Sequence, residues 1–227
     1  MRNDLNANKF TFSKQFCSKE LLKITAGIIE SYNDITAKAV KLENDENIIT
    51  SFIAINYLKN ESFKRKSLTL SNYHFDYEII ENSGRSDIRV LPINPYVEDK
   101  AYYIFECKRL NSQNLSGTTG LNAEYIKNGM CRFITEYYSS YYTENGMIGY
   151  VVEKLNIIHN IKELNKLLDN DFVNDRKNIV NARVVEKIKQ IDELNGHNHI
   201  YNSKHKTDSG KEIILLHLML DFSKNIS

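Results

Sequence analysis

Residues 84–111 read GRSDIRVLPINPYVEDKAYYIFECKRLN, and the predicted architecture is built around this stretch. It contains two strand-like runs, separated by a turn region that is marked by Pro92, Asn94 and Pro95. If the two runs pair as a hairpin, the chemistry of the chain is set by the side chains that the hairpin brings onto one face.

Side chains alternate between the two faces of a strand. In the second run Glu106 and Lys108 therefore share a face, whereas Cys107 points to the other side, into the core. In the first run Asp87 and Arg89 share a face. Pairing of the two runs predicts a single patch of surface that carries Asp87, Glu106 and Lys108.

Two carboxylates and a lysine in one patch are costly to hold unless something neutralises the acids. A divalent cation does so, and Mg²⁺ usually binds through one or two carboxylates together with waters and substrate phosphate oxygens. The lysine can then orient a metal-bound water or stabilise negative charge that develops at phosphorus. The alternative is an ordinary surface hairpin whose acidic and basic side chains are simply solvated.

Asp87 followed by Glu106-Cys107-Lys108 resembles the PD-(D/E)xK motif of the restriction-endonuclease-like nuclease superfamily. Ser86 stands where the motif has its proline, at a position that varies in the superfamily. The resemblance implies a mixed central sheet flanked by helices, and a Mg²⁺ or Mn²⁺ ion held by Asp87, Glu106 and the main-chain carbonyl of Cys107. It also implies that Lys108 acts on the attacking water.

Members of this superfamily often carry a glutamate on the helix before the first strand, where it reaches the metal. Glu46 is the nearest match, and Glu43 is its rival. An acid that is favoured by a helix N-terminus explains Glu46 equally well. Asp45 is the predicted N-cap of this helix.

The resemblance implies a Mg-dependent endonuclease that hydrolyses phosphodiester bonds of nucleic acid, with DNA favoured over RNA. A restriction or antiphage effector is its implied setting, and a homodimer would allow both strands to be cut. Arg89, Arg109 and Lys127 are the candidate nucleic-acid contacts. The alternative is a catalytically silent module that keeps the fold and binds nucleic acid or a protein partner.

The pattern of apolar residues predicts an α/β domain over 1–227. A restriction-endonuclease-like core of order helix, three strands, helix, strand is expected over about 44–152, with an N-terminal helical extension over 1–43 and C-terminal helices plus a β-hairpin over 153–227. Besides the helix that Asp45 caps, helices are expected at 20–42 (with an interruption near 33–34), 121–142, 155–168 and 180–194. Outside the quoted stretch, strands are expected at 73–79, 147–152, 197–206 and 213–222, and a turn at Asn145-Gly146.

The 227 residues include no run that approaches the ~20 apolar residues of a membrane helix, and the N-terminus lacks the apolar core of a signal peptide, so we expect a cytoplasmic protein without a membrane partner. The net charge of +1 neither requires nor excludes a nucleic-acid partner, because phosphate binding needs only a local basic surface. His199 and His205 alternate onto one face of a strand in the expected C-terminal hairpin, and His217 lies on the other strand. Two facing histidines suit a metal or phosphate site, but a structural role is the more common one.

Overall fold

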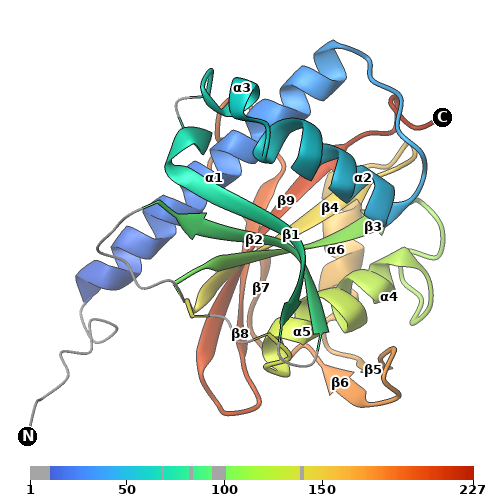
Figure 1. Cartoon of the computed structure of the whole chain (residues 1–227). Coiled ribbons are helices and arrows are strands. Elements are labelled where there is room, and N and C mark those ends of the chain that lie inside the picture. Colours follow the sequence, from blue (N-terminus) through green and yellow to red (C-terminus); the bar gives the residue numbers. More distant parts are fainter. Residues whose placement is uncertain (1–10, 68, 82–83, 94–100, 139–140) are drawn as a thin grey trace, which may run out of the picture.

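The computed structural model describes residues 11–67, 69–81, 84–93, 101–138 and 141–227. Its centre is a seven-stranded sheet with the strand order β1-β2-β3-β4-β9-β8-β7 (Figure 1). The strands of this sheet are β1 Tyr73–Glu81, β2 Gly84–Pro92, β3 Tyr103–Leu110, β4 Glu144–Val151, β7 Val184–Gln190, β8 Ile200–Lys206 and β9 Glu212–Asp221. A separate pair is formed by β5 Asp171–Val173 and β6 Ile179–Asn181.

The three central strands β3, β4 and β9 are parallel, and the strands on either side pair antiparallel. Parallel neighbours need a long connection, which is usually helical. The connection from β3 to β4 contains α4 Leu121–Tyr125, η4 Ile126–Met130 and α5 Cys131–Ile134, and the connection from β4 to β9 contains α6 Ile157–Leu167. The fold is therefore α/β with a mixed sheet, as the sequence predicted.

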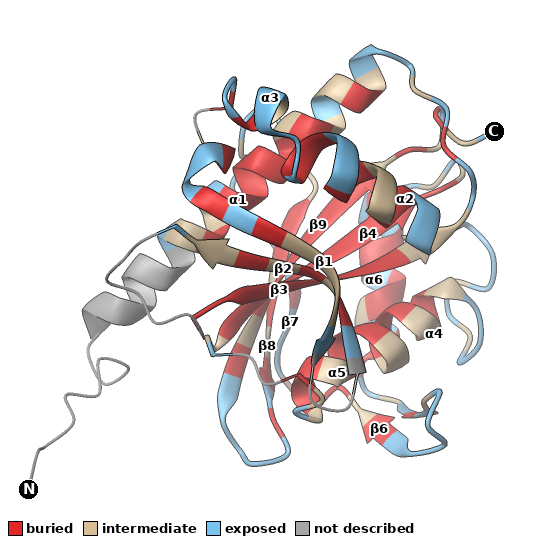
Figure 2. Cartoon of the chain, viewed as in Figure 1, coloured by how far each residue is buried: buried red, intermediate tan, exposed pale blue. Residues whose placement is uncertain are grey.

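Helices cover both faces of the sheet (Figure 1). One face carries α1 Thr11–Ala37, α2 Glu46–Ile53 and η2 Ala54–Leu58, and the short helices α3 Glu61–Lys64 and η3 Leu70–Asn72 lead from them into β1. The opposite face carries α4 to α6. Figure 2 shows that buried residues are concentrated on the sheet and on the helix surfaces that face it.

Alternation along β3 distributes its side chains between the two layers. Phe105 and Cys107 belong to the apolar cluster under α1 and α2, whereas Ile104 belongs to the cluster under α4, η4 and α6. The even-numbered residues Glu106 and Lys108 therefore lie on the α4–α5 side of the sheet, as the predicted alternation requires.

Two local predictions are confirmed by hydrogen bonds and pairing. The Asp45 side chain caps α2 by accepting hydrogen bonds from the N–H groups of Asn47 and Ile48 at 2.9 and 3.1 Å. The C-terminal hairpin is present as β8 and β9, and it extends the main sheet because β9 pairs with β4. Among the described residues, no helix is both long and apolar enough to cross a membrane.

The bounds of two helices were predicted wrongly. The first helix runs without interruption from Thr11 to Ala37 and ends before Leu42, which instead forms a β-bridge with Ile226. The helix expected over 121–142 ends at Ile134, and Glu136 then takes a left-handed φ of 54°, which a continuing α-helix does not allow.

The predicted turn at Asn145-Gly146 and the predicted helix over 180–194 are both wrong. Asn145 and Gly146 lie inside β4, where the Phe105 ring fills the space that a side chain on Gly146 would need: a Cβ there would lie 2.1 Å from Phe105 Cδ1. Residues 180–194 instead contain the end of β6 and all of β7, so α6 is the one helix described after β4. The turn residues Asn94 and Pro95 lie outside the described residues.

Candidate active site

The sheet is interrupted at Asp87. On its β3 side, β2 pairs only through Ile88↔Phe105, Arg89↔Ile104 and Val90↔Tyr103, so the ladder stops one residue before Asp87. On its β1 side, the pairing passes from Tyr77↔Ile88 to Ile79↔Ser86 and skips Asp87 as well. The β1 residue opposite, Glu78, has a φ of 56°, in the left-handed region that non-glycine residues seldom adopt.

Two carboxylates replace the missing strand along the edge of β3. Asp87 Oδ2 accepts a hydrogen bond from the backbone N–H of Cys107 at 2.7 Å. Glu46 Oε2 accepts one from the backbone N–H of Arg109 at 3.1 Å. Backbone N–H groups in a sheet need partners, and here acidic side chains from β2 and from the first turn of α2 provide them. The backbone itself thereby fixes both acids beside β3.

The ammonium group of Lys108 lies among four oxygen-bearing groups. Its Nζ is 2.8 Å from Glu46 Oε1, 2.8 Å from Glu106 Oε1, 2.7 Å from the carbonyl oxygen of Cys107 and 4.0 Å from Asp87 Oδ2. We call this set of oxygens from Glu46, Asp87, Glu106 and Cys107 the oxygen cradle. Asp87, Glu106 and Lys108, which the sequence predicted to meet, are thus brought together, and Glu46, for which two interpretations stood open, lies with them.

Glu106 is completely buried, and two further side chains hold it. Arg132 Nη1 donates a hydrogen bond to Glu106 Oε1 at 2.7 Å, and the Tyr138 hydroxyl donates one to Glu106 Oε2. Arg132 Nη1 also lies 3.2 Å from the Tyr138 oxygen. A buried carboxylate requires such partners, because leaving it unpaired costs several kcal/mol.

The crowding of acids changes their protonation. Burial, and next the charge of Glu106, raise the pKa of Asp87 to about 7, while Lys108 acts against this rise. Burial alone would lower the pKa of Lys108, but the charges of Glu106, Asp87 and Glu46 outweigh it and raise that pKa. Lys108 is therefore charged at neutral pH, and Asp87 is close to its midpoint of ionisation.

A polar cavity of about 160 Å³ opens onto the cradle. The residues that line it are Glu46, Asn47, Arg85, Asp87, Lys108, Arg132 and Tyr137. Sequence reasoning did not assign Arg85, Arg132, Tyr137 or Tyr138 to a site. The available signal was that Arg132 lies off the apolar stripe of the predicted helix, which contains Ile126, Met130, Ile134, Tyr137 and Tyr141. Tyr137 fits that stripe as a core residue, and the pattern does not single out Tyr138.

The cradle has the chemistry of a site for a hard divalent cation. All its donors are oxygens, and three of them are carboxylates. Burial and the charge of Glu106 raise the pKa of Asp87, and a positive charge beside these acids would counteract that rise. In the part of the chain that the structure describes, no three His, Cys, Asp or Glu side chains form a metal-binding group by themselves. Oxygens are the ligands that Mg²⁺ and Mn²⁺ prefer, and in this structure the oxygens of Glu46, Asp87, Glu106 and Cys107 are contacted by the Lys108 ammonium, while Arg132 also binds Glu106.

The predicted phosphate contacts lie elsewhere. Arg89 pairs with Asp76 at 2.8 Å, and Lys127 pairs with Glu124 at 2.8 Å. The Arg109 side chain donates hydrogen bonds to the backbone and side-chain oxygens of Asn44 at 2.5 and 2.9 Å. None of these three cations lines the cavity, where Arg85 and Arg132 take that place.

The C-terminal histidines form a buried hydrogen-bonded chain. His205 Nδ1 lies 2.6 Å from the carbonyl of Ala182, so this nitrogen carries the proton and Nε2 accepts from Ser203 Oγ at 2.7 Å. Ser203 in turn accepts from His217 Nε2 at 2.7 Å, and His217 Nδ1 accepts from the Tyr125 hydroxyl at 2.8 Å. One direction of donation thus satisfies every member with both histidines neutral, which assigns them a structural role.

No protein-family model matches the chain, and neither the curated proteins nor the solved structures that were searched gave a significant match. The function of this chain is therefore inferred from its own residues and geometry.

Proposed function

We propose that the chain is a metal-dependent endonuclease that hydrolyses phosphodiester bonds of nucleic acid, with DNA favoured over RNA. The observation that carries the proposal is the oxygen cradle: three carboxylates and a main-chain carbonyl lie around Lys108 at the edge of a polar cavity. Three acids lie here beside two cations, Lys108 and Arg132, so a net negative charge remains for a bound cation when all of these groups are ionised.

The order of elements supports a restriction-endonuclease-like core. From α2 to β4 the chain forms helices, three strands, helices and a strand, with Asp87 on the second strand and Glu106 and Lys108 on the third. These are the positions at which the PD-(D/E)xK resemblance requires the acids and the lysine. Glu46 on α2 completes the expected set, whereas Glu43 is exposed.

The residues of the cavity suit attack by water on a phosphodiester. A divalent cation, when bound, supplies Lewis acidity and lowers the pKa of a coordinated water. Lys108, fixed by the three acids, is placed to hydrogen-bond the attacking water or an oxygen that gains negative charge. Arg85 and Arg132 line the same cavity and suit the substrate phosphate, for which guanidinium groups have the matching fork geometry.

A second candidate function is a catalytically silent module of the same fold that binds nucleic acid or a protein. The closed ion-pair network around Glu106 favours it, because Lys108, Arg132 and Tyr138 together occupy both carboxylate oxygens. Such a module would bind without metal and would cut nothing.

The experiment that separates the two compares cleavage of supercoiled plasmid and of labelled DNA and RNA strands with Mg²⁺, with Mn²⁺ and with chelator. We expect cleavage that depends on the metal, and a fall of at least about 100-fold in Lys108→Ala, the loss typical of a group that acts on a transferred proton. Lys38→Ala is the matched control, since Lys38 forms an exposed ion pair with Asp34 on α1. Binding that needs no metal, with every substrate left intact, would support the silent module.

The wider proposal is a cytoplasmic restriction or antiphage effector that acts as a homodimer. One active site cuts one strand, so two copies related by a two-fold axis would cut both strands of a duplex.

A further inference from the structure

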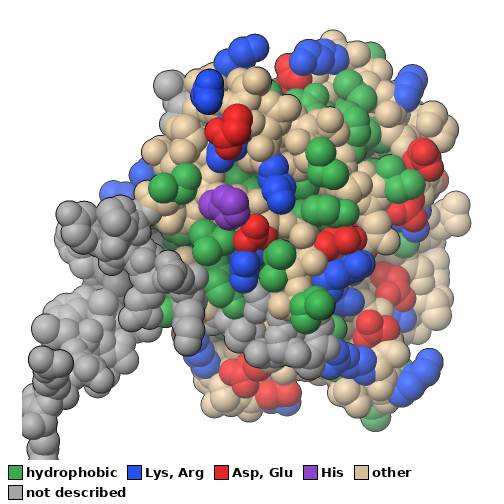
Figure 3. All heavy atoms as spheres, in the orientation of Figure 1, with side chains coloured by type: hydrophobic (Ala, Val, Ile, Leu, Met, Phe, Trp, Pro, Cys, Tyr) green, Lys and Arg blue, Asp and Glu red, His purple; other side chains and the backbone are tan. Residues whose placement is uncertain are grey.

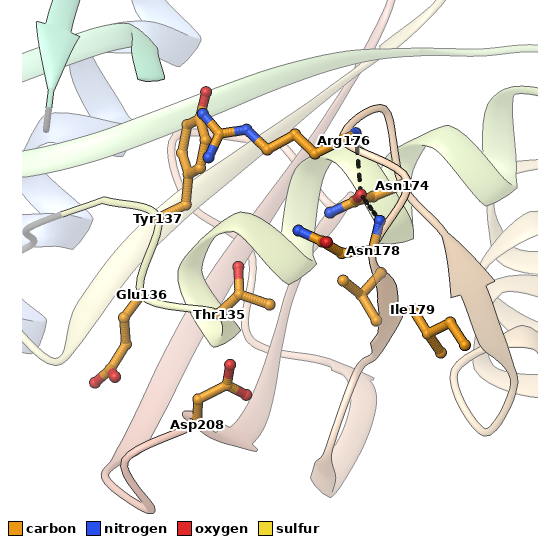
Figure 4. Close-up of a pocket in the computed structure, with 9 residues that line it drawn as sticks. Thr135, Glu136, Tyr137, Asn174, Arg176, Asn178, Ile179 and Asp208 are labelled. Carbon is orange, nitrogen blue, oxygen red and sulfur yellow. Dashed lines mark hydrogen bonds between the residues drawn. The ribbon is translucent and has the colours of Figure 1, made fainter. Parts of the chain in front are cut away.

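A second polar cavity lies beside the first, and Tyr137 forms part of the wall of both. Its volume is about 330 Å³, at the lower end of the range that is usual for small-molecule sites. Two segments provide most of its wall, the chain that follows α5 and the β5–β6 turn, and the side chains that give it its chemistry are Thr135, Glu136, Tyr137, Arg176, Asn178 and Asp208 (Figure 4).

The β5–β6 turn is connected to the candidate active site through an arginine. Arg132 binds Glu106 through Nη1 at 2.7 Å, and its Nη2 lies 3.5 Å from Asp175 Oδ2 in the turn. The Asp175 backbone N–H donates a hydrogen bond to Asn128 Oδ1 on η4 at 3.0 Å. The turn is thereby held against the helices that cover the cradle.

One rim of this second cavity is a flat cationic surface. The guanidinium of Arg176 lies 3.9 Å from the centre of the Tyr137 ring, and Figure 4 shows it extended across that ring. Asn174 Oδ1 accepts hydrogen bonds from the N–H groups of Arg176 and Asn178 at 3.0 and 2.9 Å, which fixes the backbone of the turn. Planar guanidinium groups and aromatic rings are the surfaces on which unpaired bases stack.

The other rim carries hydrogen-bond acceptors, Glu136 and Asp208, which lie away from Arg176 in Figure 4. Glu136 Oε1 accepts from the Ser209 hydroxyl at 2.6 Å, and Asp208 Oδ1 pairs with Arg183 at 2.8 Å. Carboxylates held in this way can also accept from the amino groups on the edges of nucleobases. The cavity therefore offers a stacking surface with positive charge at one end and acceptors for a base edge at the other.

We propose that this cavity is a subsite for one unpaired nucleotide of the strand whose phosphodiester bond lies in the first cavity. The inference rests on the proposed function and adds a substrate class, nucleic acid with an unpaired nucleotide beside the cleavage position. A strand that leaves the first cavity reaches the second by passing Tyr137, which both cavities share. A cavity of about 330 Å³ suits a group of the size of a base, and a base can enter it only from an unpaired position, so a continuous duplex would first have to release one.

The test measures fluorescence anisotropy of a short labelled single-stranded DNA with the Lys108→Ala chain, which removes cleavage from the measurement. Arg176→Ala in this background is expected to raise Kd roughly tenfold, the loss of about one stacking contact. The matched control is Arg65→Ala, which removes an exposed arginine that lines neither cavity. With an abasic strand or a blunt duplex, the difference between Arg176→Ala and Arg65→Ala should disappear.

The subsite is overturned if Arg176→Ala binds the strand as tightly as Arg65→Ala, or if the loss is equally large on the abasic strand. Parallel cleavage assays with otherwise native chains separate this result from failure of the proposed function. Binding that depends on Arg176 without any cleavage would support the subsite and contradict the nuclease activity. Cleavage that does not depend on Arg176 would support the nuclease activity and contradict the subsite.

Discussion

At the scale of single residues, the site depends on one positive charge among three negative ones. The Lys108 ammonium lies within 2.8 Å of oxygens from both Glu46 and Glu106, and Asp87 is 4.0 Å away. Burial, and next the charge of Glu106, raise the pKa of Asp87 to about 7. Even with Arg132 bound to Glu106, these groups carry a net negative charge when all are ionised. A bound divalent cation would balance the remaining negative charge of this site.

Millimolar Mg²⁺ should therefore raise the melting temperature of the native chain. A ligand that binds only the folded state stabilises it by about 2.7 kcal/mol at a hundredfold excess over its Kd. Asp87→Asn should lose most of this gain, because the amide still accepts from the Cys107 N–H but no longer carries charge. The exposed Asp192→Asn should keep the gain, and differential scanning fluorimetry measures all three. Equal shifts in the two variants would argue against a cation at Asp87.

Part of this site could be predicted from the sequence. The alternation of Glu106, Cys107 and Lys108 is a local property of one strand, and the structure has it as predicted. Arg132 and Tyr138 could not be assigned, because their approach to Glu106 depends on how the helical segment after β3 packs back onto the sheet and on where it ends. The same limit applies to Arg89, Arg109 and Lys127, the predicted nucleic-acid contacts, which do not line the cavity.

At the scale of elements, β4 shows why a turn signal misleads inside a buried sheet. Asn-Gly usually marks a hairpin turn, but here Asn145 Oδ1 accepts a hydrogen bond from the Ile104 N–H at 2.9 Å and Gly146 makes room for Phe105. Gly146 is required for its lack of a side chain, since its φ is not in the left-handed region.

Gly146→Ala should accordingly destabilise the fold. The new methyl group would lie 2.1 Å from Phe105 Cδ1, and overpacking of this kind typically costs about 1–3 kcal/mol. Gly196→Ala is a useful comparison, because nothing lies within 4 Å of that Cβ and the cost there comes only from a φ of 74°. Urea unfolding followed by circular dichroism measures both, and an unchanged midpoint for Gly146→Ala would contradict the close packing of Phe105 against β4.

β7 shows how a strand can imitate a helix. Its pairing with β8 shifts register between Val184 and Glu186 and again between Glu186 and Lys189. Val180 of β6 and the β7 residues Val184 and Ile188 recur every four residues, which imitates a helical stripe. Their β-branched side chains favour a strand, and the antiparallel pairing of β7 with β8 establishes it.

The buried histidine chain predicts loss of stability in acid. Burial lowers the pKa of His205 to about 4 and that of His217 to about 3, whereas histidines of an unfolded chain titrate near 6.5. The unfolded state therefore binds more protons below that pH, and the free energy of unfolding should fall by up to about 1.4 kcal/mol per pH unit for each histidine until the folded pKa is reached.

Denaturant midpoints between pH 7 and pH 4 measure this loss. His205→Gln, which can still donate to Ala182 and accept from Ser203, should flatten the dependence on pH. His159→Gln, at an exposed position on α6, should leave it steep. Identical slopes for the two variants would show that the chain of histidines is not responsible.

At the scale of the whole molecule, the sheet consists of parts that are joined unequally. β4 and β9 are joined by eight residue pairs, whereas β2 and β3 are joined by three. The β1–β2 hairpin is therefore joined to the rest of the sheet only by the three pairs between β2 and β3, and the oxygen cradle lies where this pairing ends. Figure 3 shows basic and acidic side chains interspersed over the face viewed.

Amide hydrogens of β1 should exchange before those of β4 and β9. Local opening needs less free energy where fewer contacts are broken, and we expect protection at least about tenfold lower in the hairpin than in the three parallel strands. Hydrogen exchange read by mass spectrometry on the native chain tests this. Simultaneous exchange of the hairpin and the central strands would mean that the sheet opens as one cooperative unit.

The carboxylates that stand in for a strand beside β3 have a consequence for how this chain can change. Glu46 and Asp87 each satisfy a main-chain amide, so replacing either with alanine would weaken architecture and chemistry at once. Mutations that remove these side chains would therefore also lower the stability of the fold. Under the proposed function, relatives that have lost activity should have lost the charge and kept the shape, with asparagine or glutamine in these two places.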